Sequence, residues 1–360
     1  MKVKKIKNYF PGSNTTDGFY SFYEFLPYKC EKIYIIKGGP GTGKSTAMKK
    51  IGDCALEKGF KIEYHWCSSD NNSIDGIVIP DKKIAFFDGT EPHLTDPKYP
   101  GALEEILNFC QFWDEKVLKE NKQEIISLNQ KIKERFSATY NCLKIAGILD
   151  QEQNKYQKNL INKSLLTKLK NEIYKNINPP QKNSSKTSSI RKLFGSAITP
   201  QGQVSYINSL TKDIKNKYII KGKPIIEKSK IIKEAGKKFQ TKGYSLLYLY
   251  CGFNPEYINT LIIPELDTVL INKTKLDKSL QATKSTKIFN LNETLHPEKI
   301  SNYSKRINDL NLNYNKFINK AVNNLSKAKS LHDQLENIYI KAMDFKLVDN
   351  KINDLIEDIF

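Results

Sequence analysis

Arginine is scarce in this 360-residue chain. Only three of its 58 basic residues are arginines, Arg135, Arg191 and Arg306, and the others are lysines. Arginine is the side chain best suited to reading base edges and forking around phosphates, so the net charge of +19 is weak support for nucleic-acid recognition. Lysine, isoleucine and asparagine are abundant together, which is typical of an AT-rich coding bias. A nucleic-acid partner is therefore possible but not favoured.

Long apolar runs and paired cysteines are also missing. No run approaches the roughly 20 apolar residues that a membrane-spanning helix needs, and Met1–Lys5 leads into no signal-type apolar segment. The six cysteines include no C-x-x-C pair, which argues against a disulfide framework or a zinc site. We predict a cytoplasmic protein with reduced thiols and no membrane partner. Its length indicates about two domains.

The most informative stretch is rich in glycine. It consists of Gly38, Gly39, Pro40, Gly41, Thr42, Gly43, Lys44, Ser45 and Thr46. This stretch fits the P-loop pattern, and it lies between an apolar run at 33–36, typical of a buried strand, and a segment of helical spacing that ends at Gly59. Glycines permit a tight turn whose N–H groups surround phosphate oxygens at a helix N-terminus. We predict that residues 38–46, the first loop, bind a nucleotide.

The pattern also assigns roles to single residues. Lys44 is expected to reach the β- and γ-phosphates, and Ser45 to place its hydroxyl on Mg²⁺. Asp88 follows the apolar segment 84–87, where P-loop enzymes carry the acid associated with Mg²⁺. The stretch Asn272–Lys275 resembles a guanine-reading sequence but ends in lysine instead of aspartate. We therefore predict ATP and Mg²⁺ as the ligands, with Ser45 and Asp88 at the metal.

The group that activates the attacking water is less clearly marked. Many P-loop ATPases place a glutamate directly after the acid that Asp88 represents, but here Gly89 follows. The alternatives are Glu91, Asp70, Asp75 and His93. We predict Lys44, Asp88 and Glu91 as the catalytic residues. Arg135 could neutralise developing charge, although an arginine on a helix is more often solvated.

An internal repeat changes the interpretation of the whole chain. With a shift of 184 residues, Gly18–Thr90 aligns without a gap on Gly202–Thr274. The segment Tyr34–Gly38 falls on the identical sequence Tyr218–Gly222, and the pair Lys44–Ser45 falls on Lys228–Ser229. The chain is therefore a tandem duplication of one P-loop unit.

The second copy of the loop, residues 222–230, departs from the pattern. Ile225 and Glu227 replace Gly41 and Gly43, and Asn272 replaces the acid of the first copy. A β-branched side chain resists the backbone angles that the glycines adopt, and a carboxylate repels phosphate. We predict that this second loop is degenerate and that only the first loop binds Mg-nucleotide, while the apolar strand positions preserve the fold.

Strands alternate with helices in each copy, which predicts an α/β fold in which a P-loop NTPase core, a parallel sheet with helices on both faces, occurs twice. Segments 102–136 and 137–176, and later 297–360, have helical spacing and predict a helical hairpin or bundle after each core. The predicted domains are 1–178 and 191–360. Residues 179–190 form a linker rich in Pro, Asn and Ser. We expect the two cores to pack as an intramolecular pseudo-dimer.

These features resemble an uncharacterised family of bacterial two-repeat P-loop ATPases, found mainly in Gram-positive bacteria. The resemblance is carried by Lys37–Ser45, Cys67–Asn71, Asp75–Pro80, Asp88–His93, Asp96–Ala102, Gly195–Pro200 and Cys251–Phe253. It covers essentially the whole chain, the helical parts most weakly. It implies ATP binding at the first loop. The chain differs from the family in its second loop, which the family more often keeps intact.

Three functions fit these observations. The first is a Mg²⁺-dependent ATPase whose nucleotide state moves the helical segments or the second half. The second is a nucleotide or small-molecule kinase that holds its acceptor in the polar loop Ser68–Ser73, although three arginines are few for gripping two phosphorylated substrates. The third is an ATP-sensing scaffold without turnover. The sequence favours the ATPase.

Overall fold

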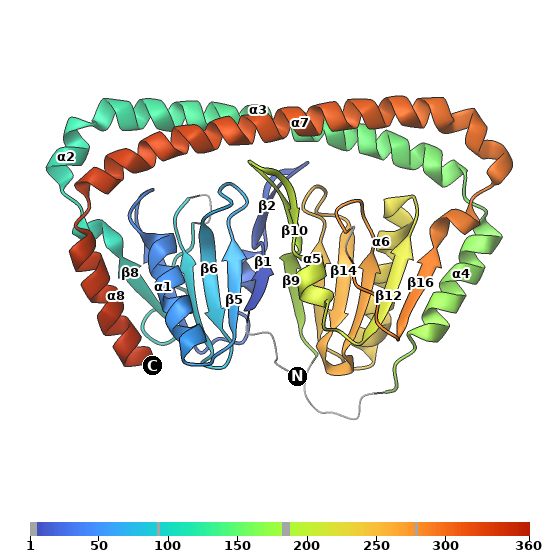
Figure 1. Ribbon diagram of the computed structural model, residues 1–360, viewed down its shortest axis with the longest axis horizontal. Helices are drawn as coiled ribbons and strands as arrows, with labels where there is room; N and C mark the ends of the chain where they lie inside the picture. Colours follow the sequence, from blue (N-terminus) through green and yellow to red (C-terminus); the bar gives the residue numbers. More distant parts are fainter. Residues whose placement is uncertain (1–5, 92–93, 182–187, 278–279) are drawn as a thin grey trace.

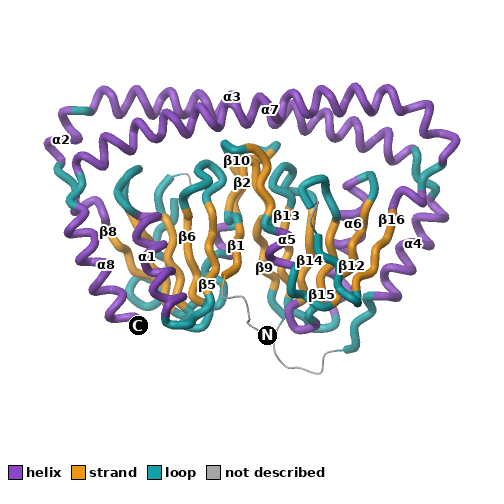
Figure 2. Tube along the Cα trace, viewed as in Figure 1, coloured by secondary structure: helices purple, strands orange, loops and turns teal. Residues whose placement is uncertain are grey.

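Two similar α/β halves make up the part of the chain described in a computed structural model, residues 6–91, 94–181, 188–277 and 280–360. Each half is built on a six-stranded sheet, and two long helices run across the same end of both sheets (Figure 1). The strands of the two halves stand side by side beneath these helices (Figure 2). In the described residues no helix has a stretch both long and apolar enough to cross a bilayer.

The first sheet has the strand order β1-β5-β6-β7-β4-β8. Its strands are β1 (Ile6–Tyr9), β4 (Lys32–Lys37), β5 (Ile62–Trp66), β6 (Ile74–Ile79), β7 (Ile84–Asp88) and β8 (Glu104–Asn108). The predicted parallel sheet is in fact mixed, because β6 is antiparallel to both β5 and β7. Residues 80–83 are too few for the crossover that parallel strands require, so the chain must reverse there.

The second sheet repeats this order as β9-β13-β14-β15-β12-β16. Its strands are β9 (Ile190–Phe194), β12 (Asn216–Lys221), β13 (Leu246–Tyr250), β14 (Ile258–Ile263), β15 (Thr268–Asn272) and β16 (Thr286–Asn290). The shift of 184 therefore extends back to residue 6, where β1 corresponds to β9. From β8 and β16 onward the offset is 182, so the helical regions are part of the repeat as well.

Each sheet is covered by a helix on one face and by shorter segments on the other. The helix α1 (Lys44–Glu57) packs on the first sheet and α6 (Ile225–Thr241) on the second. The opposite faces are covered by η1 (Tyr23–Phe25) in the first half and by α5 (Ile207–Thr211) in the second. The prediction of helices on both faces is therefore wrong for the first half, where a three-residue 3-10 turn takes the place of a helix on the second face. The remaining short elements are β2 (Gly12–Thr15), β3 (Gly18–Ser21), η2 (Phe109–Phe112), α2 (Glu115–Glu120), β10 (Ser196–Thr199), β11 (Gly202–Ser205), η3 (Pro264–Leu266) and η4 (Leu291–Thr294).

The two long helices, α3 (Lys122–Asn159) and α7 (Pro297–Ala342), form a pair of helical arms that spans both cores (Figure 1). A helix of 38 residues is about 57 Å long at 1.5 Å per residue, enough to reach from one core to the other. Proline is absent from residues 122–159, and α3 continues through the point near 136 where a hairpin was predicted. Small and apolar residues such as Ala146 and Leu325 pack at the seam between the arms.

The helices that follow the arms are exchanged between the halves. Ile173 of α4 (Lys163–Asn176) lies in the apolar cluster of the second core, whereas Val348 and Ile352 of α8 (Phe345–Ile359) lie in that of the first. The prediction that each helical segment stays with its own core is therefore wrong. Burying an aliphatic side chain contributes roughly 1.5–3 kcal/mol to the free energy of unfolding, so each of these helices stabilises the half against which it packs.

The exchange is reciprocal. Bridges join Trp113 to Met343 and Ile161 to Leu295, and these pairs coincide under the offset of 182. The backbone N–H of Asp114 donates to the oxygen of Ala342 at 2.8 Å, and the equivalent N–H of His296 donates to the oxygen of Leu160 at 2.7 Å. Each arm is thus fastened at its far end to the opposite core.

The two cores also meet directly, between β1 and β9. Phe10 and Phe194, which are equivalent in the repeat, exchange two backbone hydrogen bonds of 3.0 Å, and Phe22 packs beside them. One ion pair breaks the symmetry: Arg191 of the second half lies 2.8 Å from Glu63 of the first, and both side chains are buried. The contact between cores therefore combines an apolar centre with one buried charge pair.

Candidate functional site

The first loop connects β4 to α1 at the end of the sheet that faces the arms. Gly41 has φ of 68° and Gly43 has φ of 89°, which are left-handed values that glycine adopts without strain. Helix α1 begins only after Gly43, at Lys44. Left-handed residues at such a turn leave the backbone N–H groups free to converge on an anion. The backbone of this stretch therefore suits phosphate binding.

Lys44 folds back over this loop. Its Nζ donates to the backbone oxygens of Gly38 at 2.8 Å and Gly39 at 2.7 Å, and it lies 3.6 Å from Oδ2 of Asp88. The lysine side chain is 10% exposed. Thr42 is also buried and its hydroxyl donates to the oxygen of Gly39. The predicted lysine and the predicted acid are therefore in contact.

Asp88 ends β7, which pairs directly with β4 in parallel, so that Ile36 lies opposite Asp88. Oδ1 of Asp88 accepts hydrogen bonds from the N–H of Thr90 at 2.9 Å and from its hydroxyl. Ser45, in the first turn of α1, accepts a hydrogen bond from the N–H of Ile74 at 3.0 Å. Both predicted metal ligands thus come from rigid elements at the same end of the sheet.

A second acid lies beside this pair. Asp75 is on β6, not in a loop, and it is 7% exposed. The pKa of Asp75 is raised to about 7, chiefly by burial and also by the nearby Asp88 charge, against hydrogen bonds that favour the ionised form. A carboxyl that titrates near neutral pH beside a candidate site marks the position as electrostatically unusual.

The other sequence candidates fall outside this centre. Asp70 accepts hydrogen bonds from the N–H of Asn72 and the hydroxyl of Ser73, as a turn-forming aspartate does. Glu91 is exposed beyond the turn that follows β7, and Arg135 is exposed on α3. His93 lies outside the described residues.

The C-terminal end of α7 lies on the first loop, an arrangement that the sequence reasoning missed. A Cβ built on Gly39 would lie 2.7 Å from the ring of Tyr339, and one built on Gly41 would lie 2.7 Å from the backbone oxygen of Glu336. Lys329, further back on α7, pairs with Asp70 at 3.3 Å. The second half therefore supplies a wall of the site in the first. No single residue marks this placement in the sequence, because the 182-residue offset shows only that the helical regions repeat.

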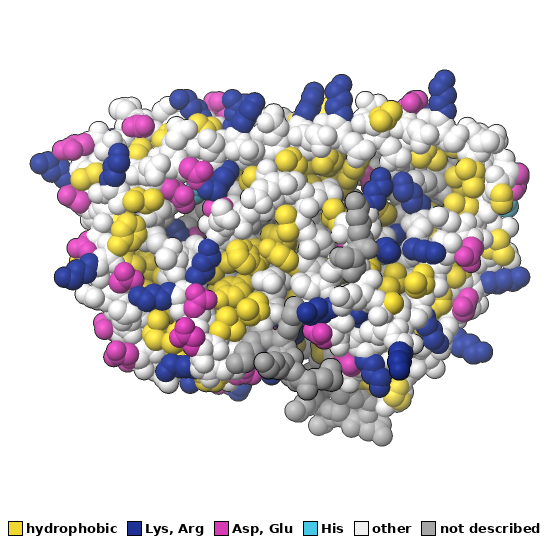
Figure 3. Space-filling view, viewed as in Figure 1, with side chains coloured by type: hydrophobic (Ala, Val, Ile, Leu, Met, Phe, Trp, Pro, Cys, Tyr) yellow, Lys and Arg dark blue, Asp and Glu magenta, His cyan; other side chains and the backbone are white. Residues whose placement is uncertain are grey.

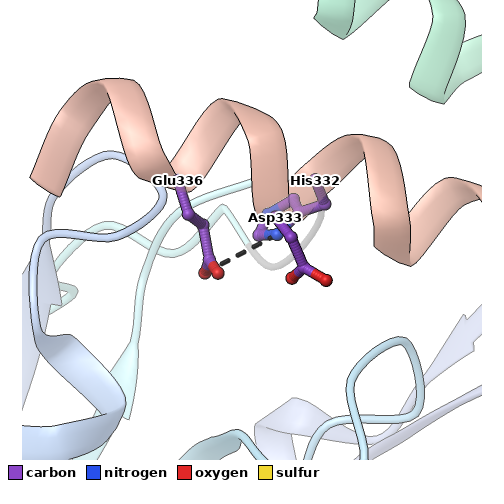
Figure 4. Close-up of side chains that lie close together, drawn as sticks. All are labelled: His332, Asp333 and Glu336. Atoms are coloured by element: carbon purple, nitrogen blue, oxygen red, sulfur yellow. Dashed lines mark ion pairs between the residues drawn. The ribbon is translucent and has the colours of Figure 1, made fainter.

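Three side chains on α7 lie together near this wall. Ligand atoms of His332, Asp333 and Glu336 all lie within 4.8 Å of one another (Figure 4). Nδ1 of His332 is 3.6 Å from a carboxylate oxygen of Glu336, and Asp333 pairs with Lys329. All three are partly exposed, so water has access to them.

The second loop has a different conformation. Helix α6 starts at Ile225, three residues earlier than α1 does in the repeat alignment, and residues 225–227 are helical where the first loop has Gly41–Gly43. Lys228 is 1% exposed and donates to the oxygen of Lys273 at 2.9 Å. A helical turn thus replaces the left-handed glycines.

The charges of the second site are altered too. The pKa of Lys228 is lowered to about 7, chiefly by burial and also by the neighbouring charge of Lys223, while the charge of Asp277 opposes this shift. Asn272 is fully buried, and within the described structure neither its amide nitrogen nor its amide oxygen has a hydrogen-bond partner. Asn259 stands where Asp75 stands in the first half. The second site therefore lacks both acids of the first.

Charged side chains of both signs are interspersed on the face shown in Figure 3, over the arms as well as over both cores. That distribution favours a solvated surface on this face over a dedicated groove for a polyanion. Comparison of the chain with protein-family models, with curated proteins and with solved structures found no match.

Proposed function

We propose that the protein is a Mg²⁺-dependent ATPase that uses the first loop alone. One observation carries the proposal: Lys44 bridges the loop oxygens and Asp88, at the end of a left-handed glycine turn that opens a helix. The backbone N–H groups would hold the phosphates, and the amine of Lys44 would neutralise charge between the β- and γ-phosphates. The second loop would hold no nucleotide.

The residues present suit magnesium. Mg²⁺ prefers oxygen ligands, and the hydroxyl of Ser45 and the carboxylate of Asp88 are oxygen donors that keep free lone pairs beside their hydrogen bonds. When bound, Mg²⁺ neutralises phosphate charge and orients the phosphoryl group. The contact between Lys44 and Asp88, 3.6 Å between Nζ and Oδ2, would hold that carboxylate beside the loop.

The two halves are proposed to work as an intramolecular pseudo-dimer with one active member. The contact of Phe10 with Phe194 and the reciprocal fastening of the arms support this arrangement. The second half would then serve as a fixed support. A conformational change at the first loop would be transmitted to α7 and through α7 to the second core. A cytoplasmic location remains a prediction from the cysteines.

Phosphate release from ATP and Mg²⁺ by the full-length chain tests the proposal. Lys44→Ala should lower the rate by about 10²-fold or more, because it removes a preorganised positive charge from the transferred phosphoryl group. Lys228→Ala, the matched substitution in the second loop, should leave the rate and the ATP-induced rise in melting temperature unchanged.

Each alternative outcome has a defined meaning. Transfer to an added acceptor without phosphate release would select the kinase. A rise in melting temperature with ATP but no turnover would select the scaffold. Turnover that is insensitive to Lys44→Ala would reject the first loop as the site.

A further inference from the structure

Among the described residues of the first core, the acids that neighbour Asp88 in the sequence or in space are poorly placed to activate water. Gly89 follows that residue, and Glu91 is exposed past the turn. Asp75 is buried and bound to Tyr23 and Cys67, so it faces into the protein. A hydrolase at this loop still requires a group that takes a proton from the attacking water. The helix α7 carries a carboxylate that is placed for this role.

Glu336 is one of the residues of α7 that lie against the first loop. A Cβ on Gly41 would lie 2.7 Å from the backbone oxygen of Glu336 and 3.1 Å from its Cα. Two further contacts follow along the chain, Tyr339 of α7 against Gly39 and Phe345 of α8 against Gly43. The backbone of Glu336 is thus held in position beside the proposed phosphate site.

The side chain points toward the first core. In Figure 4, Glu336, His332 and Asp333 project from the side of α7 that faces away from α3 and toward the loops of the first half. The Glu336 side chain is 27% exposed, so a water molecule can reach its carboxylate. His332, one turn earlier and 3.6 Å away, restricts the orientation of that carboxylate.

The second half provides an independent comparison. Under the offset of 182, Asn154 of α3 is the counterpart of Glu336, and it lies over the second core with its amide nitrogen 3.5 Å from the hydroxyl of Tyr257. The offset is supported by matched helix caps, Asn162 and Asp344, and by matched buried leucines at the arm seam. Three carboxylates of the first site, Asp75, Asp88 and Glu336, correspond to Asn259, Asn272 and Asn154.

Other acids of α7 also lack an acidic counterpart, since Asp309 corresponds to Ser127 and Asp333 to Gln151. Glu336 is distinguished by its place, because its backbone lies against Gly41 and its side chain is directed toward the first core.

We infer that Glu336, supplied by the second half, is the carboxylate that activates water at the first loop. This inference rests on the proposed ATPase function. The water oxygen forms a bond to the γ-phosphorus while the bond from that phosphorus to the bridging oxygen breaks, and the electron pair of that bond leaves with ADP. The water proton passes to Glu336 and then to the phosphate product. His332 is a positioning residue for this carboxylate.

The test compares Glu336→Gln with the full-length wild type and with Asp309→Asn, which removes one acid from an exposed part of α7 far from the loop. Glu336→Gln should keep the ATP-induced rise in melting temperature and lose turnover by about 10²-fold. Asp309→Asn should keep both. His332→Ala should lower turnover less than Glu336→Gln, with ATP binding unchanged.

Two outcomes overturn the inference. Wild-type turnover in Glu336→Gln removes its chemical role, and joint loss of ATP binding and turnover makes it a binding residue instead. If Glu336→Gln does not fold, Glu336→Asp provides the second variant, since it keeps the charge at a shorter reach, and wild-type turnover in it overturns the inference. A wild-type rate insensitive to Lys44→Ala rejects the proposed function itself, which distinguishes the two failures.

Discussion

The first and second loops follow strands that end in the same four residues, and they contain the same lysine–serine pair, yet only the first has left-handed glycines directly before this pair. In the second half, residues 225–227 have no need of left-handed angles, and the helix extends over them. The strand order is nevertheless the same in both halves. The comparison teaches that the fold is maintained by apolar strand positions, while a binding site depends on a few backbone angles and charges.

The two lysines show the same contrast in electrostatic terms. Lys44 is near an acid and two carbonyl oxygens, whereas burial and the charge of Lys223 lower the pKa of Lys228 to about 7. Burial favours the neutral form of a lysine, and the charge of Asp277 does not offset this for Lys228. The second lysine has become a structural residue that donates to the oxygen of Lys273.

The largest effect is expected when Asp88 of the first site is replaced by asparagine, the residue that its counterpart Asn272 supplies in the second site. Asp88→Asn gives the first site the residue of the second and should lower Mg²⁺-dependent ATP turnover by about 10²-fold, because the site loses a charge that holds the metal. Phosphate release measured against Mg²⁺ concentration checks this. Unchanged rate and Mg²⁺ dependence would contradict the role of Asp88.

The reverse substitution is the matched control. Asn272→Asp should create no second site, since the helical turn at 225–227 still occupies the loop. It should also destabilise the protein, because it places a carboxylate in a fully buried position. A second equivalent of bound ATP in this variant would show that the charge alone had disabled the second loop.

The next largest effect is expected on the free energy of unfolding, from the buried ion pair between Arg191 and Glu63. Burial alone would raise the pKa of Glu63, but the Arg191 guanidinium and hydrogen bonds from His65 and Arg191 hold it well below its usual range. Arg191→Met leaves this carboxylate buried and unpaired and should cost about 3–5 kcal/mol of unfolding free energy. Urea unfolding measures this cost.

A double variant separates the pair from the packing around it. Glu63→Met combined with Arg191→Met removes both charges and should recover most of the loss. The positions equivalent to Arg191 and Glu63 are Lys7 and Leu247, so no such pair links the halves at the symmetric place. Failure of the double variant to recover would place the cost in packing instead of charge.

The smallest effect concerns pH. The folded state keeps the proton of Asp75 up to a pKa of about 7, whereas the unfolded chain loses it near the ordinary value of 3.8. Between these values the folded state binds more protons, so stability falls as the pH rises. Asp75→Asn, which copies Asn259, should be more stable than wild type by on the order of 2 kcal/mol at pH 8 and nearly equal at pH 4. Chemical denaturation across this range measures the difference, and parallel pH profiles would contradict it.

The local parts of the structure could be predicted from the sequence. The apolar run 33–36, the glycine stretch and Gly59 define β4, the first loop and α1 because strand, turn and helix start all depend on neighbouring residues. The motif predicted roles for Lys44 and Asp88 at one site but not whether their strands are neighbours. The structure shows that β7 pairs directly with β4 and that the two side chains are in contact.

The nonlocal parts could not be predicted. The sequence predicts a helix over residues 102–136, yet Glu104–Asn108 forms a strand. The segment is mostly polar and has a single deeply buried aliphatic residue, Leu107, so only its pairing with β4 makes it a strand. The exchange of α4 and α8 depends on how far α3 runs, which no single residue marks. Glu336 belongs to this class, since its place beside the first loop depends on the whole length of α7.

The exchange of α8 also bears on the order in which the protein folds. The apolar cluster of the first core contains Ile51 from early in the chain and Ile352 from near residue 360. During synthesis this core remains incompletely packed until almost the entire second half has been made. Contacts of such long sequence separation slow folding and expose apolar surface meanwhile. The nascent first half is therefore expected to depend on chaperones until residues 345–359 emerge.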